Sequence, residues 1–449
     1  GAAGYLAGLG ARLDITEIDG FDNLHAPEGI LRDAMARAAA LWGSRRAYFL
    51  VNGATGGILA GVRALTTRGD KVIVARNSHQ AVYHALELME LDAAYVLPAF
   101  DEVTGLPGSV TPESVEQALR AHPDARLVIV TSPTYDGAVS DIASIARAAH
   151  ARGVPLLVDE AHGAHLGFHP YFPGGAVRAG ADIVVQSVHK TLPSLTQTAI
   201  AHAGGLADPD RFQAALDIFQ TTSPSYLLLA SIDGCVRLIE REGEGLFEAW
   251  ATRLSGFEDA TRALRRIALL ERGENERSMF AFDRSKIVIS TRGLNLTGPK
   301  LMDLLRARHG IELEMAARDY ALAMTGLTEQ DGALEALAAA LLEIDRECVP
   351  TSALDSGGAP FLPERGMPIA QALLMEREAV PVSEAAGRVS AQYAWAYPPG
   401  IPLIAPGEVV DGRFLREAAR GLRAGIALRG GPAEGLHWVV RGAQAVPPK

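Results

Sequence analysis

Short apolar runs alternate with amphipathic helical segments between residues 46 and 190. The apolar runs are AYFLVNG, KVIVARN, AAYVLP, ARLVIVTSPTYDG, VPLLVDEAHG and DIVVQSVHK. Most of them are separated by segments with a helical spacing of apolar residues, such as TGGILAGVRALTTRGD and SHQAVYHALELMEL. Continuous apolar strands that alternate with amphipathic helices predict an α/β fold, in which helices cover both faces of a mostly parallel sheet.

Polar residues gather where these apolar runs end. They are Asn52-Gly53, Asn77-Ser78-His79, Thr134-Tyr135, Asp159-Glu160 and Ser187 to Lys190. In open parallel sheets, ligands bind beyond the carboxyl ends of the strands. The pattern therefore predicts a functional site at this edge of the sheet.

The remaining pattern divides the chain into four parts. Residues 1–30 have weak periodicity and are predicted to form an N-terminal arm, and residues 31–275 form the large domain. Residues 276–350 have the pattern of a smaller α+β domain. Residues 351–449 begin with a linker rich in Pro, Gly and Ser and continue into a C-terminal domain.

Composition and charge exclude several classes of protein. The net charge of −11 argues against a general nucleic-acid binder. No apolar run approaches the ~18–20 residues that span a bilayer, so we expect no membrane partner. Cys235 and Cys348 are too few for a disulfide framework. A reducing, cytoplasmic setting is the simplest expectation.

Lys190 ends one of the apolar runs, where a lysine is costly to bury. A desolvated lysine has a lowered pKa, and its neutral amine can form Schiff bases. Asp159 follows another apolar run, and a carboxylate there could pair with the protonated pyridine nitrogen of pyridoxal 5′-phosphate. Taken singly, a surface lysine and a turn or N-cap aspartate are the ordinary alternatives.

The segment VNGATGGILAG runs from a strand through small residues into a helix. Small residues let the backbone approach a phosphate, and a new helix offers free N–H groups and a favourable dipole. The segment is neither a P-loop nor a GxGxxG fingerprint, and a plain strand-to-helix turn is the alternative. His79 opens the next predicted helix, where its flat ring could stack on a flat cofactor; a structural histidine is the alternative.

A metal site is a rival interpretation of one loop. His and carboxylate side chains bind zinc or iron, and this loop holds Asp159, Glu160, His162, His165 and His169. Their spacing is H-x-x-H rather than HExxH, which makes the metal interpretation the less favoured one.

Taken together, these residues resemble the PLP-dependent ornithine/lysine/arginine decarboxylases of the aspartate-aminotransferase fold (fold type I), in the short form without a wing domain. The resemblance covers most of the chain. It rests on DITEIDGFDNLHAPEG, FLVNGATGG, RNSH, SPTYDG, VDEAHGAHLGFHP, QSVHKTLPSLTQ, QTTSPSYLLLASID and YPPGIPLIAPGE, in the order of the family.

The resemblance implies a role for each site residue. Lys190 would form the Schiff base with pyridoxal 5′-phosphate, Asp159 would hold the pyridinium proton, and His79 would stack on the ring. His162 would line the pocket near cofactor and substrate. The residues implied to hold the phosphate are Ala54, Thr55, Gly56, Ser187 and His189.

The resemblance also implies a homodimer, or a larger homo-oligomer, with a shared active site. Ser223 and Ser225 would reach the phosphate of the neighbouring subunit. Glu408 is the first candidate to bind the basic side chain of the substrate, with a solvated loop carboxylate as the alternative. Gln80 and Val188 replace a lysine and a hydroxyl residue that are usual in the family, which leaves open a shifted substrate or weakened activity.

The expected function is decarboxylation of a basic amino acid, with arginine favoured over lysine and ornithine, in polyamine-related metabolism. Another fold type I reaction, such as transamination or aldol cleavage, is an alternative. An aminotransferase would need an arginine for the substrate carboxylate, and Arg388 is the place to look for it. A catalytically silent relative that binds pyridoxal 5′-phosphate is a further alternative.

Overall fold

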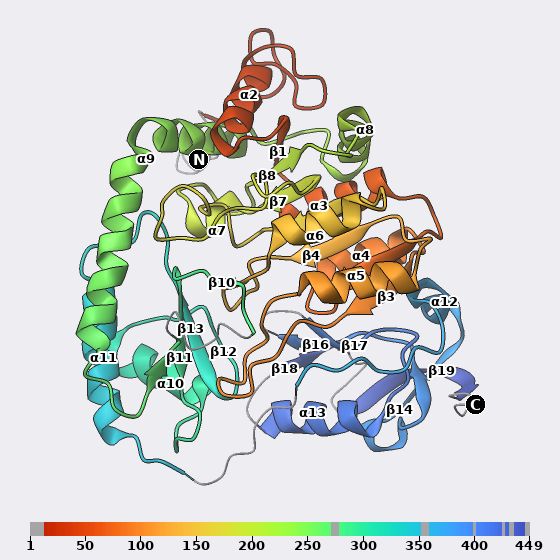
Figure 1. The fold of residues 1–449 in the computed structure, drawn as a ribbon, viewed down its shortest axis with the longest axis vertical. Helices are drawn as coiled ribbons and strands as arrows, with labels where there is room; N and C mark the ends of the chain where they lie inside the picture. The colour runs from red at the N-terminus through yellow and green to blue at the C-terminus, as the bar shows by residue number, and fades with distance from the viewer. Residues whose placement is uncertain are drawn as a thin grey trace, which may run out of the picture.

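The computed structural model describes residues 13–270, 278–351, 359–397, 401–423, 427–430 and 435–444. Its largest sheet in this part of the chain has seven strands (Figure 1). In spatial order they are β1 (Arg46–Leu50), β8 (Ala199–Ala203), β7 (Ile183–Gln186), β6 (Leu156–Asp159), β4 (Val128–Thr131), β2 (Lys71–Ala75) and β3 (Asp92–Val96). β8 pairs antiparallel with both β1 and β7, and the other four strand pairs are parallel, so the predicted mostly parallel sheet is confirmed.

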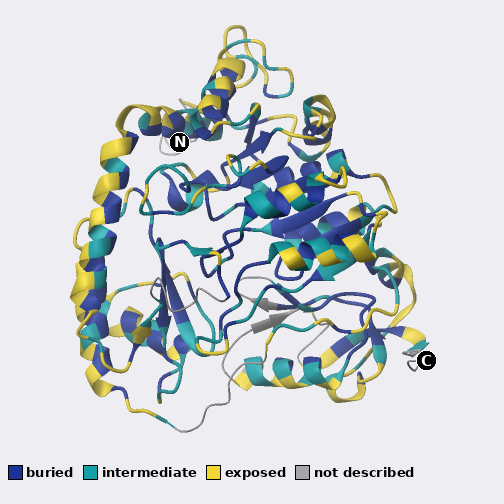
Figure 2. Ribbon diagram, in the orientation of Figure 1, coloured by how far each residue is buried: buried dark blue, intermediate teal, exposed yellow. Residues whose placement is uncertain are grey.

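Helices cover both faces of this sheet, as the alternation predicted. One face packs against α3 (Gly53–Leu65), α4 (Gln80–Leu88) and α8 (Pro209–Phe219). The other face packs against α5 (Pro112–Ala121) and α6 (Ile142–His150). Side chains of successive residues in β6 point to opposite faces of the sheet. Leu157 packs in the core on the first face, and Leu156 and Val158 pack in the core on the second face. The inner strands β8, β7, β6, β4 and β2 are almost entirely buried, which explains their continuously apolar sequences (Figure 2).

Two glycines let α3 lie close to the sheet. A Cβ atom at Gly57 would lie 2.5 Å from Leu50 Cδ1, and one at Gly61 would lie 2.7 Å from Leu157 Cδ1. Larger residues would push the helix away from the strands. The close packing sets the first turn of α3 at the carboxyl edge of the sheet.

A second, smaller unit contains a four-stranded antiparallel sheet in the order β12 (Met315–Ala316), β13 (Tyr320–Met324), β11 (Lys286–Ser290) and β9 (Ala268–Leu269). Its helical segments are α10 (Gly298–Leu304), η1 (Leu305–His309) and α11 (Ala333–Glu347). β9 precedes residue 276, where the sequence predicted the domain boundary. That boundary stays a prediction.

A helix of 36 residues, α9 (Tyr226–Thr261), runs along one side of the molecule (Figure 1). It packs against α2 (Ile30–Trp42) of the large unit and against α11 of the small unit. A two-stranded ladder between β5 (Ala138–Val139) and β10 (Ala281–Phe282) also joins the two units. The small sheet is thereby held beside the carboxyl edge of the large one.

The C-terminal part adds two three-stranded sheets. One contains β14 (Arg377–Pro381), β19 (Leu436–Gln444) and β15 (Arg388–Ser390), and the other contains β17 (Ile401–Ile404), β16 (Ala394–Tyr397) and β18 (Ala427–Arg429). The remaining elements are α12 (Ile369–Leu374), η2 (Val382–Glu384) and α13 (Gly412–Arg423). Residues 1–12 of the predicted arm and 398–400 of the YPPGIPLIAPGE motif lie outside the described residues. None of the described helices combines the length and apolar character needed to cross a bilayer.

A buried ion pair joins the C-terminal part to the main sheet. Arg76, just after β2, makes two hydrogen bonds to Glu408, of 2.8 and 2.9 Å. Both side chains are almost fully buried. Glu408 also accepts the Ala405 N–H, and the guanidinium lies 5.0 Å from the ring centroid of Tyr95. Each charge is expensive to bury alone, so the pair ties the two parts together.

Replacement of Arg76 by Met should lower the free energy of unfolding by about 3–5 kcal/mol, because it leaves the Glu408 carboxylate buried without its cation. Urea denaturation followed by tryptophan fluorescence measures the change. Arg120→Met is the matched control: its exposed pair with Glu116 should contribute less than about 1 kcal/mol. Equal losses in the two variants would contradict a special role for the Arg76–Glu408 pair.

Candidate active site

A cavity of about 370 Å³ lies at the carboxyl ends of β1, β2, β4, β6 and β7. The predicted site residues that line it are Ala54, Thr55, His79, Asp159, His162, Ser187, His189 and Lys190. The other lining residues are Gly53, Ile58, Asn77, Gln80, Pro107, Thr131, Pro133, Thr134, Tyr135, Asp136, Ala161, Glu314 and Ile401. The structure thus brings together, around one space, residues that the sequence spreads over several strand ends.

Lys190 lies in α7 (Val188–Thr191), a short helix directly after β7. Burial lowers the pKa of its amine, although the carboxylates of Asp159 and Glu314 act in the opposite direction. Its Nζ lies 2.8 Å from Nε2 of His162. An amine with a lowered pKa in a cavity is suited to act as a nucleophile.

Asp159 is the last residue of β6 and is buried. Its carboxylate accepts the Ala161 N–H at 3.1 Å. Burial raises its pKa, while His79 and Lys190 act to lower it. A cationic ring nitrogen beside this carboxylate would relieve the cost of burying its charge.

His79 caps the start of α4, where its Nδ1 accepts the Ala81 N–H at 3.2 Å. Burial lowers the pKa of the imidazole. The neutral ring therefore carries its proton on Nε2, and its orientation is fixed by the helix that it caps. A neutral, fixed, flat ring is suited to stack on another flat ring.

The start of α3 has the features of an anion site. Its N-cap residue Asn52 makes no side-chain hydrogen bond to the first turn, which leaves N–H groups free beside Gly53, Ala54 and Thr55. Gly56 is buried one residue further along; it does not line the cavity, and a Cβ atom there would lie 3.2 Å from Asn52 Cβ. The free N–H groups and the helix dipole together favour a phosphate.

Two polar atoms in the cavity wall lack a protein partner. Asn77 Oδ1 and Thr131 Oγ1 are buried, and neither has a hydrogen-bond partner among the described residues. A buried polar atom without a partner costs about 1–3 kcal/mol, so a bound group would satisfy these two. An amine, a buried carboxylate, a flat ring and an anion site around one cavity fit pyridoxal 5′-phosphate.

Three predicted residues lie away from this cavity. Glu408 is engaged by Arg76, so its predicted contact with the substrate stays a prediction, and one that this ion pair disfavours. Ser223 is exposed and Ser225 is the N-cap of α9. Neither lines the cavity of this chain, and their predicted reach into a neighbouring subunit stays a prediction.

Sequence reasoning assigned no role to three side chains at or beside the cavity. The Tyr135 hydroxyl donates to Glu314 Oε1 at 2.5 Å, and both residues line the cavity. Lys286 Nζ lies 3.1 Å from His162 Nδ1. Tyr135 sits in a recognised strand-end motif, but Glu314 and Lys286 come from the small unit. One signal was available for Lys286: only five of the 42 Lys and Arg residues in the chain are lysines.

The side chains of the rival metal site have separate partners. Glu160 accepts hydrogen bonds from Gln186 and from the Ala176 N–H. His165 pairs with Asp283, and His169 pairs with Glu248. In the part of the chain that is described, no three His, Cys, Asp or Glu residues form a group that could hold a metal ion.

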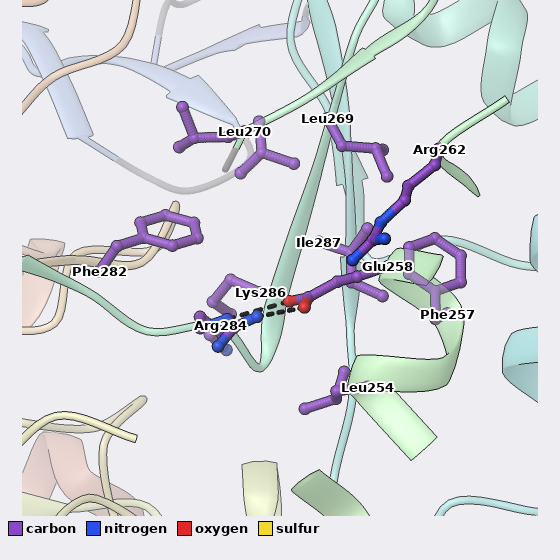
Figure 3. A pocket seen from close by; sticks show the side chains of 11 residues that line it. Leu254, Phe257, Glu258, Arg262, Leu269, Leu270, Phe282, Arg284, Lys286 and Ile287 are labelled. Carbon is purple, nitrogen blue, oxygen red and sulfur yellow. Dashed lines mark hydrogen bonds and ion pairs between the residues drawn. The ribbon is translucent and has the colours of Figure 1, made fainter. Parts of the chain in front are cut away.

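A second cavity, of about 180 Å³, lies between α9 and β11. Figure 3 shows Arg284 and Glu258 bonded to each other across it. Its other lining residues are Leu254, Phe257, Arg262, Leu269, Leu270, Phe282, Lys286, Ile287 and Val288. The charges of Arg284 and Glu258 satisfy one another, and the predicted site residues line the first cavity instead.

Comparison with known proteins gives a consistent family match. The model of the Orn/Lys/Arg decarboxylase major domain matches residues 5–292, and that of the C-terminal domain of the same family matches residues 367–418. An arginine decarboxylase of Bacillus subtilis is 34% identical over 432 residues, which cover 95% of this chain and 88% of that protein. An arginine decarboxylase of Bacillus anthracis is 32% identical over 428 residues, with 93% and 86% covered.

Comparison with solved structures agrees with this family match. The solved lysine decarboxylase A of Pseudomonas aeruginosa superposes with a TM-score of 0.77 at 23% identity, over 95% of this chain and 73% of that one. At this identity the likeness shows the fold alone. It supports the predicted assignment to fold type I.

Pyridoxal 5′-phosphate should raise the thermal unfolding midpoint of the cofactor-free protein, because a ligand that binds only the folded state stabilises it by about 2.7 kcal/mol at a hundredfold excess over its Kd. Pyridoxal without the phosphate should produce a smaller rise, because the first turn of α3 then has no anion to bind. Differential scanning fluorimetry compares the two. Equal shifts would show that the α3 turn does not bind the phosphate.

Proposed function

The chain belongs to the Orn/Lys/Arg decarboxylase family, and from this premise we propose that it removes the α-carboxyl group of arginine with the help of pyridoxal 5′-phosphate. The single observation that carries the proposal is the convergence of Lys190, Asp159 and His79 on one cavity. Decarboxylation of a basic amino acid is the activity in the name of the family and in the names of several curated relatives.

Pyridoxal phosphate, when bound, supplies an electron sink for the pair of electrons left when carbon dioxide departs. The protein must position and tune that sink. Lys190 would offer the amine that holds the cofactor and later releases the product. Asp159 would keep a proton on the ring nitrogen, and His79 would stack on the ring.

Proton return to the α-carbon needs a donor close to Lys190. We assign this role to the pair formed by Lys190 Nζ and His162 Nε2, which lie 2.8 Å apart. Ala54, Thr55, Ser187 and His189 line the same cavity and would hold the phosphate. These roles agree with the burial of the pair and with the lowered pKa of the Lys190 amine.

Arginine is the favoured substrate because four relatives with 32–34% identity over most of the chain are named arginine decarboxylases. A lysine decarboxylase of Pseudomonas aeruginosa is more distant, at 24% identity. We propose Glu314 as the partner of the cationic side chain. It lines the cavity, and the Tyr135 hydroxyl orients one of its oxygens. A carboxylate can bind a guanidinium by two parallel hydrogen bonds.

An aminotransferase reaction is less well supported. No arginine lines the cavity in the described part of the chain. Arg388 lies in β15 and pairs with Glu378. We further propose, from the family, a role in polyamine-related metabolism in the cytoplasm and a homodimer in which Ser223 and Ser225 approach the neighbouring site. A catalytically silent relative would bind the cofactor without turnover.

A product screen tests the reaction and the substrate together. The protein with pyridoxal 5′-phosphate should release carbon dioxide from arginine, and mass spectrometry should detect the corresponding amine, agmatine. Lysine and ornithine serve as competing substrates. Lys190→Ala should abolish turnover, whereas Lys300→Ala, at an exposed position, should leave it unchanged. Full activity of Lys190→Ala would exclude the assigned role, and cofactor colour without product would favour the silent relative.

Glu314→Gln should raise the KM for arginine about 10- to 100-fold, because a hydrogen bond to a charged group contributes about 1.5–3 kcal/mol. Glu312→Gln is the matched control: Glu312 lies two residues away in an exposed pair with Arg306. Steady-state kinetics on both variants measure the KM for arginine. If instead Glu408→Gln raised KM and Glu314→Gln did not, Glu408 would be the substrate's partner.

A further inference from the structure

A buried row of three basic side chains leads from the small unit to the candidate nucleophile. Lys286 Nζ lies 3.1 Å from His162 Nδ1, and His162 Nε2 lies 2.8 Å from Lys190 Nζ. Lys286 is the first residue of β11 and only 1% exposed. A lysine buried to this degree is rare unless it is paired, so its presence in the row needs a reason.

The choice of lysine at this position is itself informative. The chain has five lysines among its 42 Lys and Arg residues. Of the other four, Lys71 pairs with Asp92, Lys300 is exposed, Lys449 lies outside the described residues, and Lys190 is the candidate nucleophile. Two of the five thus contact one histidine. Arginine stays protonated under all ordinary conditions, whereas a buried lysine can change its protonation.

His162 limits how protons can be distributed along this row. Burial, Lys286 and Lys190 all lower its pKa, so its ring is neutral. A neutral imidazole has one nitrogen that donates and one that accepts. It cannot accept from two ammonium groups, and therefore at most one of the two lysines is a charged donor to it.

The surrounding charges decide which lysine holds the proton. Asp283, Asp136 and Glu314 all favour the charged form of Lys286, against burial and Lys190, which lower its pKa to about 8. Lys190 is faced by Asp159 and Glu314. Asp283 and Asp136 act on Lys286, Asp159 acts on Lys190, and Glu314 acts on both lysines. Lys286 therefore has two carboxylates of its own, and Lys190 has one.

We propose that Lys286 is a positioning residue for Lys190. Its ammonium donates to Nδ1 of His162, the proton of His162 therefore lies on Nε2, and this N–H donates to the lone pair of Lys190, which keeps that amine neutral and nucleophilic. The inference rests on the proposed function only in taking Lys190 as the reacting amine. A residue of the small unit thereby helps to keep an amine of the large unit neutral.

Competitive labelling of amines tests the proposal in the full chain freed of cofactor. A trace of acetic anhydride reacts only with neutral amines, and peptide mass spectrometry reports the labelled fraction of Lys190 against pH. In Lys286→Met, labelling of Lys190 near neutral pH should fall about tenfold, which corresponds to a rise of its apparent pKa by about one unit. Lys286→Arg, which retains the cation and a donor, should label Lys190 as the wild type does.

Lys71 and Lys300 serve as internal references whose labelling should not change. Unchanged labelling of Lys190 in Lys286→Met would overturn the proposal. Because no substrate and no cofactor take part, a negative result in the product screen leaves this test valid. The two proposals can therefore fail separately.

A second measurement has its main readout on the wild-type protein. Nitrogen NMR of wild-type protein labelled with ¹⁵N-histidine reports which ring nitrogen of His162 carries the proton, with His162→Gln used for assignment. The Nε2–H form is expected, and a mixture of both forms is expected in Lys286→Met. The Nδ1–H form in the wild type would overturn the proposal, because Lys190 would then be the charged donor.

Discussion

The rest of this structure depends on one constraint: several ionisable side chains are buried away from water at the carboxyl edge of the mostly parallel sheet. Asp159 and Lys190 end up in a cavity because they follow apolar strands that are covered on both faces. Burial favours the neutral form of each group, and each remains charged or reactive only as its neighbours permit. The close packing of α3, the capping of α4 by His79 and the short helix α7 all position those neighbours at the same edge.

The small unit completes the electrostatic environment. Tyr320 donates to the buried Asp136 of the large unit, and Lys286 and Glu314 approach the cavity from the same side. The β5–β10 ladder and α9 hold this unit in place. The environment of the candidate site is therefore formed by two packed units, although the residues proposed to bind the cofactor come from one.

Much of this arrangement could be predicted from the sequence, because local patterns encode it. Apolar runs and helical spacing indicated the sheet, and strand-end polar residues led to Lys190, Asp159 and His79. The helix α9 was not predicted, since Gly234, Gly243, Gly245 and Gly256 interrupt its helical propensity. Contacts between distant residues could not be found this way. The Lys286–His162 contact spans 124 positions, and the partner of Glu408 is 332 positions away.

The Arg76–Glu408 pair has a consequence for how this chain could be recombined with others. The two matched segments of the family look like separable modules, since each has its own model. Yet the first contains a buried cation whose neutralising charge is supplied by the second. Arg76 lies one residue before Asn77 in the cavity wall, so an exchanged C-terminal segment that lacked the matching carboxylate would disturb the candidate active-site cavity as well as the interface. A C-terminal segment taken from another chain should therefore carry a carboxylate at the position of Glu408.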